Sequence, residues 1–217
     1  MEPTPLHLQK DDIFVNEIYR GYDDQFLYLD KECDPIIDRL KKLNKEKLKK
    51  GEIETLPNSY HSENLWQHEV FGPFVNFVMQ QMWNILNWQG YNLEGRIPML
   101  QECWVQEFPE EGGFHDIHIH GNNIISGFYF LKCNQKTSKP HFHDPRPGKA
   151  MVDIPPKDKK AVNSANSQIH YPVKPGQFIF FNSWMPHSYT HHKGKEKFRF
   201  IHFNMAAPLN PNNTESN

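Results

Sequence analysis

Short apolar runs with a two-residue period fill the second half of the chain, and they constrain its fold more than any other feature. In a β-strand alternate side chains share a face, so each run predicts a strand with one buried side. The runs are rich in Phe, Ile, Tyr and Val, and turn residues separate them. The expected strands are Met99–Phe108, Phe114–His120, Ile124–Leu131, Lys139–Asp144, Ile169–Val173, Gln177–Asn182 and Lys197–Asn204. Short strands at this spacing predict a mostly β fold of the jelly-roll type.

Residues 1–95 show a different pattern, in which apolar residues recur every three or four positions. This period predicts amphipathic α-helices, and we expect them to support one sheet of the jelly roll. The expected elements are a helix that starts at Asp34-Pro35, a helix from Gly72-Pro73 to Gly90, and short strands at Ile13–Tyr19 and Phe26–Leu29.

We expect the 217 residues to form a single domain. Residues 1–95 would be a helical N-terminal elaboration, residues 96–206 the β core, and residues 207–217 a flexible tail. The polar stretch Met151–Ser167 contains Pro155-Pro156, so we expect a loop over or beside the mouth of the barrel.

Composition excludes several classes of partner. The formal net charge is −2, so no basic field points to nucleic acid or to an anionic membrane surface. No apolar run approaches the roughly 18 to 20 residues that span a bilayer, and the N-terminus lacks the apolar core of a secretory signal. Cys33, Cys103 and Cys133 are widely separated, which argues against a disulfide scaffold or a zinc knuckle. We therefore expect a reducing, cytoplasmic setting. A homodimer is compatible with the sequence, although no residue specifies one.

Histidine is the compositional anomaly, with 13 residues, and two of them, His118 and His120, share one face of an expected strand. Asp116, His118 and His120 are expected on one face of that strand. Ile117 and Ile119 then point to the opposite, apolar side. Two imidazoles two residues apart on a rigid strand can bind one metal ion. The alternative is a pair of surface histidines in a polar strand.

A third histidine and an arginine follow in the C-terminal quarter. His187 comes after the apolar strand Gln177–Asn182 and next to Pro186, where it suits a third metal ligand. Arg199 lies in an apolar strand, and a buried unpaired charge is very costly, so it needs an anionic partner. The carboxylate of a small ligand inside the barrel would pair with it bidentately. An intramolecular salt bridge is the alternative.

The order of these motifs resembles the bacterial and phage group of 2-oxoglutarate/Fe(II) oxygenases, over residues 99–205. Members carry an HxHPxS-like turn, an SGxYY strand, an FxDPR segment and a closing RxSxxFN strand. The corresponding segments here are His118–His120, Ser126–Leu131, Phe142–Arg146, Pro175-Gly176, His187 and Arg199–Asn204.

The resemblance implies an oxygenase with a double-stranded β-helix. It implies Fe(II) with His118 and His187 as two of its ligands, and 2-oxoglutarate as cosubstrate with its distal carboxylate held by Arg199. Ser126, on a neighbouring strand, could add a hydroxyl contact or be an ordinary packing residue. The implied reaction consumes O₂, releases succinate and CO₂, and hydroxylates an unactivated C–H bond of an amino acid, a peptide or a small metabolite.

The chain departs from the superfamily pattern where a carboxylate ligand is expected, because that position is His120. Three candidates can complete the ligand set, namely His120 itself, Asp116 from the same face, and Asp144 from a neighbouring strand. We favour His120, with Asp144 next. Asp144 could otherwise pair with Arg146.

Two other functions remain open at this point. A cupin-like metalloprotein that acts without 2-oxoglutarate would use the same histidines. However, residues 121–125 lack the glutamate that cupins place after the histidine pair, and Arg199 would have no role. A non-catalytic β-sandwich binding or structural protein would need the metal ligands and Arg199 to coincide by chance.

Overall fold

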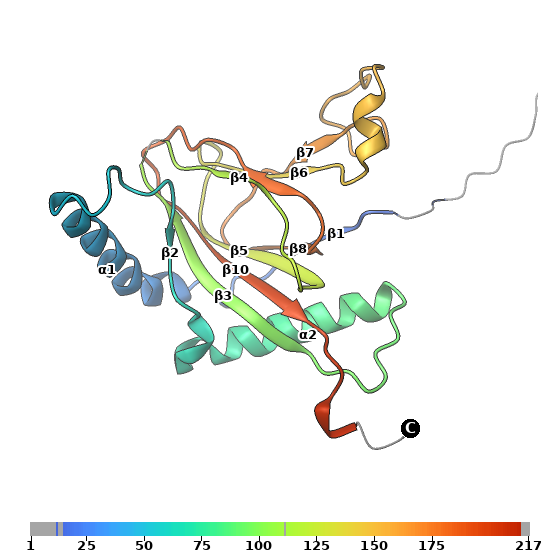
Figure 1. Ribbon diagram of the computed structural model, residues 1–217, viewed down its shortest axis with the longest axis horizontal. Helices are drawn as coiled ribbons and strands as arrows, with labels where there is room; N and C mark the ends of the chain where they lie inside the picture. Colours follow the sequence, from blue (N-terminus) through green and yellow to red (C-terminus); the bar gives the residue numbers. More distant parts are fainter. Residues whose placement is uncertain (1–11, 13–14, 111, 214–217) are drawn as a thin grey trace, which may run out of the picture.

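The computed structural model describes residues 12, 15–110 and 112–213 and consists of two antiparallel sheets and two long helices (Figure 1). The helices are α1 (Leu29–Lys49) and α2 (Gly72–Trp88), and short 3₁₀ turns lie at η1 (Leu65–Gln67), η2 (Glu69–Phe71), η3 (Pro147–Met151) and η4 (Pro211–Asn213). The strands are β1 (Ile18–Tyr22), β2 (Tyr60–His61), β3 (Met99–Phe108), β4 (His115–His118), β5 (Ile125–Lys132), β6 (Pro140–His143), β7 (Gln168–His170), β8 (Gln177–Asn182), β9 (His187–Tyr189) and β10 (Phe198–Ala206).

The two sheets form the expected double-stranded β-helix. The larger sheet has the strand order β1-β8-β5-β10-β3-β2, and the smaller sheet has the order β4-β9-β6-β7. Consecutive strands therefore alternate between the sheets through much of the core, which is typical of a jelly roll. Figure 1 shows the smaller sheet on one side of the larger sheet and α2 on the other. The predicted mostly β fold is confirmed.

Two expected elements at the N-terminus were wrong. Residues 26–28 form a turn that leads into α1, and α1 begins at Leu29 rather than at Asp34-Pro35. The reason is burial, because Leu29, Cys33 and Ile37 repeat every four residues and are all buried against the sheet. This packing extends the helix before Pro35 and outweighs the helix-start signal at that residue. Of the expected strand Ile13–Tyr19, residues 13 and 14 lie outside the described residues.

The core has two layers because side chains alternate across the larger sheet. One face packs on the helices, where Phe74 of α2 meets Tyr129 and Phe203 at ring distances of 5.5 and 5.8 Å. The other face encloses the barrel interior, which is filled by aromatic rings. The buried members of this inner layer include Phe108, Phe128, Phe130, Phe142, Phe181, Tyr189, Phe198 and Phe200.

Gly127 of β5 illustrates how tightly the helix side of the sheet is packed. A Cβ atom at this position would lie 2.3 Å from the Phe203 ring and 2.9 Å from the Ile179 carbonyl oxygen. Only glycine leaves room for that ring. Gly127 therefore has a packing role in this sheet.

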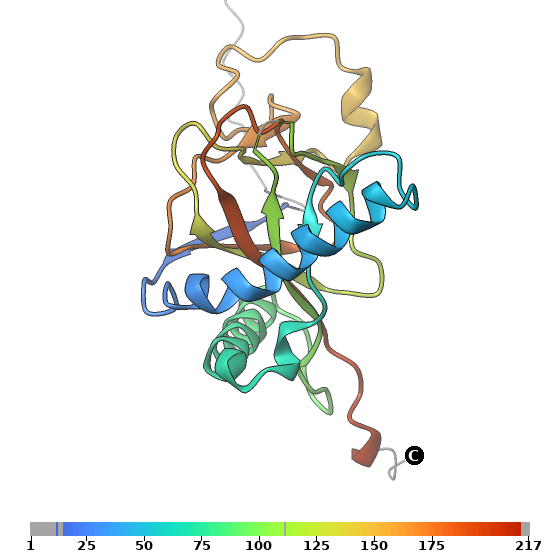
Figure 2. The same cartoon turned by 90° about the vertical axis from the view of Figure 1, so that its left-hand side faces the viewer.

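The helix α1 runs across the larger sheet (Figure 2), and an ion-pair network centred on the buried Arg199 joins the two. The Arg199 Nε atom donates to Glu107 Oε2 at 2.6 Å, and its Nη1 atom donates to Asp30 Oδ1 and Asp34 Oδ1, each at 2.8 Å. Arg199 and Glu107 are 0% and 1% exposed, so water does not screen their interaction. Lys132 also contacts Asp30, at 2.6 Å. Lys41 of α1 also pairs with Glu107.

Neither α1 nor α2, nor any other helix in the described part of the chain, combines the length and apolar character that crossing a bilayer requires.

The buried network leads to a stability prediction. Arg199→Ala should lower the free energy of unfolding by about 3–5 kcal/mol, because it leaves the Glu107 carboxylate buried without its main partner. Arg39→Ala is the matched control, since Arg39 pairs with Glu63 at an exposed position, and its effect should stay within about 0.5 kcal/mol. Urea denaturation followed by circular dichroism measures both. Equal effects of the two substitutions would contradict this account.

Candidate metal centre

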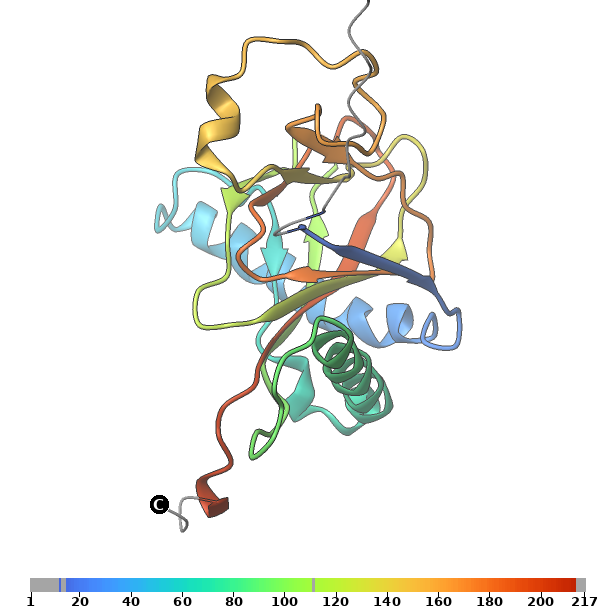
Figure 3. The ribbon, with the colours of Figure 1, turned by 90° about the vertical axis from the view of Figure 1, so that its right-hand side faces the viewer.

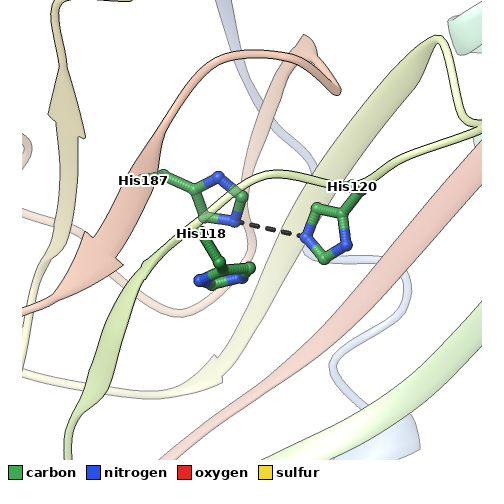
Figure 4. A group of neighbouring side chains, drawn as sticks. All are labelled: His118, His120 and His187. Atoms are coloured by element: carbon green, nitrogen blue, oxygen red, sulfur yellow. Dashed lines mark hydrogen bonds between the residues drawn. The ribbon is translucent and has the colours of Figure 1, made fainter.

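Three histidines meet where the smaller sheet approaches the larger one (Figure 4). His118 ends β4 and His187 begins β9, and the antiparallel pairing of these strands places the two residues opposite each other. His120 follows β4 by two residues, and its backbone N–H donates to the Ser183 carbonyl oxygen at 3.0 Å. The sequence predicted this trio of residues. It did not predict that His187 starts a strand of its own.

The three imidazoles are close enough to share one metal ion. Each offers one ligand atom, and these atoms lie within 4.8 Å of one another. The Nε2 atoms of His120 and His187 are 3.3 Å apart. The ring of His118 lies 4.2 Å from that of His187 and 5.0 Å from that of His120. Within the described residues, this group contains no carboxylate.

Backbone carbonyl groups orient two of the rings. His118 Nδ1 lies 2.7 Å from the Asp116 carbonyl oxygen, and His187 Nδ1 lies 3.0 Å from that of Met185. A carbonyl oxygen only accepts, so each Nδ1 carries the proton and donates it. Each Nε2 atom then keeps its lone pair for a metal ion. Outer hydrogen bonds of this kind are typical of histidine ligands.

The third ring is held by side chains of the larger sheet that the sequence analysis missed. Asn204 Nδ2 lies 3.3 Å from His120 Nδ1 and donates to Glu102 Oε2 at 2.6 Å, while Asn204 Oδ1 accepts from His202 Nε2 at 3.0 Å. His202 is 2% exposed, and its ring lies 4.6 Å from that of His120. The two-residue period of β10 could have identified them, because Phe200, His202 and Asn204 share its inner face.

Burial keeps the three imidazoles neutral. It lowers the pKa of His118 below its usual value, and it lowers the pKa of His120 to about 4 with help from His118 and His115. The pKa of His187 is well below its usual value, mainly through burial and then through His118. Neutral imidazole is the form that binds metals. The site is therefore prepared for a cation at neutral pH.

The structure does not bring Asp116 or Asp144 into this group. The Asp116 side chain is exposed, and only its backbone carbonyl reaches His118. Asp144 accepts two hydrogen bonds from the Arg146 guanidinium, at 2.9 and 2.7 Å, which lower the pKa of its carboxyl group. Asp144 therefore forms the intramolecular pair with Arg146 that was the alternative to metal binding.

The expected alternation of side chains between the two faces of the strand around His118 was also wrong in part. Ile117 and Ile119 are 60% and 56% exposed rather than packed on an apolar side. The pairing of β4 with β9 is irregular between His115 and His118, so the side chains do not alternate strictly there. As a result His115 stays beside the cluster, with its ring 4.2 Å from that of His118. His61 of β2 extends the row, with its ring 6.1 Å from that of His115.

Arg199 does not reach the site, and the expectation that it anchors a ligand inside the barrel was wrong. Its side chain lies on the helix side of β10 and pairs with Glu107, Asp30 and Asp34. Its neighbours Phe198 and Phe200 take the inner face. The RxSxxFN pattern explains the error, because counting back from Phe203-Asn204 puts its arginine at position 198, which is phenylalanine here.

Ser126 lies on the inner face of β5, opposite Asn204. Its hydroxyl group is fully buried and lies 2.8 Å from the hydroxyl oxygen of Ser183. The contact to Ser183 agrees with a packing role, and a ligand contact from Ser126 stays a prediction.

Comparison with known proteins finds one matching family. The model of the family described as "Putative 2OG-Fe(II) oxygenase" matches residues 102–204. No match is found among curated proteins.

Solved structures agree in fold. The chain is similar to a prolyl-4-hydroxylase from Pseudomonas putida, with 13% identity, a TM-score of 0.53, and coverage of 88% of this chain and 92% of the other. It also matches an oxidoreductase of the 2OG-Fe(II) oxygenase family from Burkholderia pseudomallei, with 8% identity, a TM-score of 0.38, and coverage of 50% of this chain and 44% of the other. A third match is HygX from Streptomyces hygroscopicus with nickel and 2-oxoglutarate bound, with 6% identity, a TM-score of 0.47, and coverage of 69% of this chain and 70% of the other. Of these three structures, the prolyl-4-hydroxylase supports the fold of this chain.

The ligand set leads to a binding prediction. His118→Ala and His187→Ala should each weaken Fe(II) binding by more than the roughly 10- to 100-fold that loss of an outer partner costs. Asp144→Ala is the control, because its partner is Arg146, and it should keep the affinity of the parent protein. Anaerobic titration with Fe(II) measures these variants together with His120→Ala, which should also weaken binding. Loss of affinity in Asp144→Ala with retention in His120→Ala would reverse the assignment.

The low pKa values lead to a second prediction. Protons compete with a metal only where the imidazoles are protonated, and the pKa of His120 is about 4 instead of 6.5. Metal affinity should therefore stay constant as the pH falls from 8 to 6.5, and decline only below that value. Titration with Co(II), followed by its visible absorption, measures this profile. A decline in metal affinity that begins above pH 6.5 would contradict this account, because the imidazoles would then titrate like free histidine.

Proposed function

Since residues 102–204 belong to the 2OG-Fe(II) oxygenase family, we propose that the chain hydroxylates an unactivated C–H bond of an amino acid, a peptide or a small metabolite. The chain is an iron- and 2-oxoglutarate-dependent oxygenase, and hydroxylation is the outcome we assign to it. One observation carries the proposal. The three clustered histidines all fall inside the segment that matches the family.

The donor set fits the metal that the family uses. Imidazole nitrogen is a common ligand of Fe(II), and the three residues that would hold it are His118, His120 and His187. When bound, iron and 2-oxoglutarate supply the activation of O₂, and the cosubstrate leaves as succinate and CO₂. The protein must orient the reactants and exclude water from the site.

Aromatic side chains surround the buried member of the trio. The rings of Phe181, Phe128 and Phe142 lie 4.7, 5.7 and 6.2 Å from the ring of His187. Such walls exclude water, which strengthens electrostatic interactions in the site and protects reactive species from side reactions. This environment supports attack on a C–H bond rather than simple hydrolysis.

A cavity near the site supports a small substrate, although none of the three histidines lines it. Its volume is about 790 Å³, within the range of small-molecule sites. Phe142 and Met185 line it, and both also contact His187, through the ring and through the backbone carbonyl. The polar part of its lining comes from Asn163, Asn166, Gln168, Asp144 and Arg146. We place the substrate here, under the loop that includes η3 (Figure 3).

The cellular compartment and the oligomeric state of the chain are also proposals. Cys33, Cys103 and Cys133 are free thiols, which agrees with the reducing, cytoplasmic setting that we propose. The site itself needs one copy of the chain, because a single chain supplies all three histidines. Dimerisation would therefore add stability rather than complete the site.

The proposal is tested with purified protein, Fe(II) and 2-oxoglutarate in the absence of O₂. We expect the weak visible charge-transfer band of a chelated 2-oxo acid on Fe(II), and its loss in His187→Ala. After O₂ is admitted, succinate should form. Iron binding without the band would favour a cupin-like metalloprotein, and absence of iron binding would favour a structural β-sandwich. Either result contradicts the proposed function.

A further inference from the structure

Three further histidines lie on the outer face of the smaller sheet. His141 and His143 belong to β6, and His170 belongs to the neighbouring edge strand β7 (Figure 1). The residues that alternate with them, Phe142 and Ile169, pack in the inner aromatic layer, so the three imidazoles point the other way. We call His141, His143 and His170 the outer trio, and the three histidines of the metal centre the inner trio.

The strand register places the outer trio in the same arrangement as the inner trio. In the inner trio two histidines lie opposite each other on antiparallel strands, and the third follows one of them by two residues. In the outer trio His141 lies opposite His170, and His143 follows His141 by two residues. Side chains at such positions share a face and are close enough for long or aromatic residues to meet. One sheet therefore carries the same histidine pattern on both of its faces.

The rings of the outer trio are almost as close together as those of the inner trio. The ring of His141 lies 4.4 Å from that of His143 and 5.7 Å from that of His170, whereas the rings of the inner trio are 4.2, 5.0 and 5.1 Å apart. The ligand atoms of the outer trio do not all lie within 4.8 Å of one another, as those of the inner trio do. His170 is exposed, so its ring can turn toward the other two without disturbing the core. Closure of the outer trio therefore requires rotation of one exposed side chain.

The chemistry of the outer trio also suits a metal ion. His143 Nε2 lies 2.9 Å from the Ser188 hydroxyl oxygen, so Nδ1 is the nitrogen of that ring available to a metal. Burial, followed by the influence of His143 and His170, lowers the pKa of His141 to about 4. Burial also lowers the pKa of His143 below its usual value. Both rings are therefore neutral at neutral pH, which is the form that binds metals.

From these observations we infer that the outer trio binds a second metal ion, a divalent transition metal of which Zn(II) is the best match. Three imidazoles with an open fourth position form a known Zn(II) ligand set. The order of metal affinities for nitrogen ligands places Zn(II) above Fe(II), so this exposed trio should hold Zn(II) more tightly than Fe(II). The inference goes beyond the proposed function and does not depend on it, because no residue of the outer trio belongs to the metal centre.

A metal ion at the outer trio would fasten a long loop. His143 comes directly before residues 144–167 and His170 follows them, and the Asp144 backbone N–H donates to the Ser167 carbonyl oxygen at 2.8 Å. This loop supplies much of the lining of the cavity in which we place the substrate. The ion would tie β7 to β6 and so fix both ends of the loop. The outer site is therefore structural, and it holds the segment that borders the substrate.

The test counts bound ions by isothermal titration calorimetry with Zn(II) alone. The parent protein should bind two ions per chain, one at each trio. His141→Ala should bind one ion, since His141 is the member that contacts both of the others. His187→Ala should also bind one ion, and the variant with both substitutions should bind none. Zn(II) should raise the unfolding temperature of His187→Ala but not that of the doubly substituted variant, because only the former has a site left.

His68→Ala is the matched control. His68 is an exposed histidine between η1 and η2, and it lies outside both trios. This variant should bind two Zn(II) ions, like the parent protein. His170→Ala should bind one ion, which separates a site of three histidines from a site made by β6 alone.

Three results would overturn the inference. They are a single bound ion in the parent protein, two bound ions in His141→Ala or His170→Ala, and loss of an ion in His68→Ala, which would show that scattered surface histidines bind the metal. Binding of Fe(II) and 2-oxoglutarate should be unchanged in His141→Ala, because the inner trio is intact. Failure of the outer site would thus leave the proposed function standing, and failure of the proposed function would leave the outer site in place.

Discussion

The two-residue period of β10 is the constraint on which the rest of the structure depends. This strand lies in the middle of the larger sheet, between β5 and β3, so both of its faces are buried. On one face, Arg199 forms ion pairs with carboxylates of α1 and β3. On the other face, Asn204 forms hydrogen bonds with His202 and with the ring of His120. A shift of one residue would exchange the two faces. Attachment of the helix and support of the metal centre are thus set by the same register.

The metal centre itself depends on how β4 meets β9. Antiparallel pairing places His118 beside His187, and the chain after β4 brings in His120 with its backbone bound to Ser183. Carbonyl groups and Asn204 then hold the rings, and burial keeps them neutral. A three-histidine site of this kind puts more positive charge on the metal than a site with one carboxylate.

Much of this could be predicted from local sequence patterns. The period of two residues identified β3 with its exact bounds, and the His-x-His motif with His187 identified the trio. The errors concern contacts between distant segments. The role of Arg199 depended on Asp30 and Asp34, which approach it only because α1 starts at Leu29 and packs across the sheet. The exposure of Ile117 and Ile119 depended on an irregular pairing of β4 with β9, which no local pattern reports.

The central claim is that three histidines, with no carboxylate, hold the iron of this oxygenase. The most direct test is a crystal structure of the protein prepared anaerobically with Fe(II), with diffraction recorded on both sides of the iron absorption edge. We expect one anomalous peak, bound by nitrogen atoms of His118, His120 and His187. A peak bound by the carboxylate of Asp116 or Asp144, or a peak away from the three histidines, would contradict the claim.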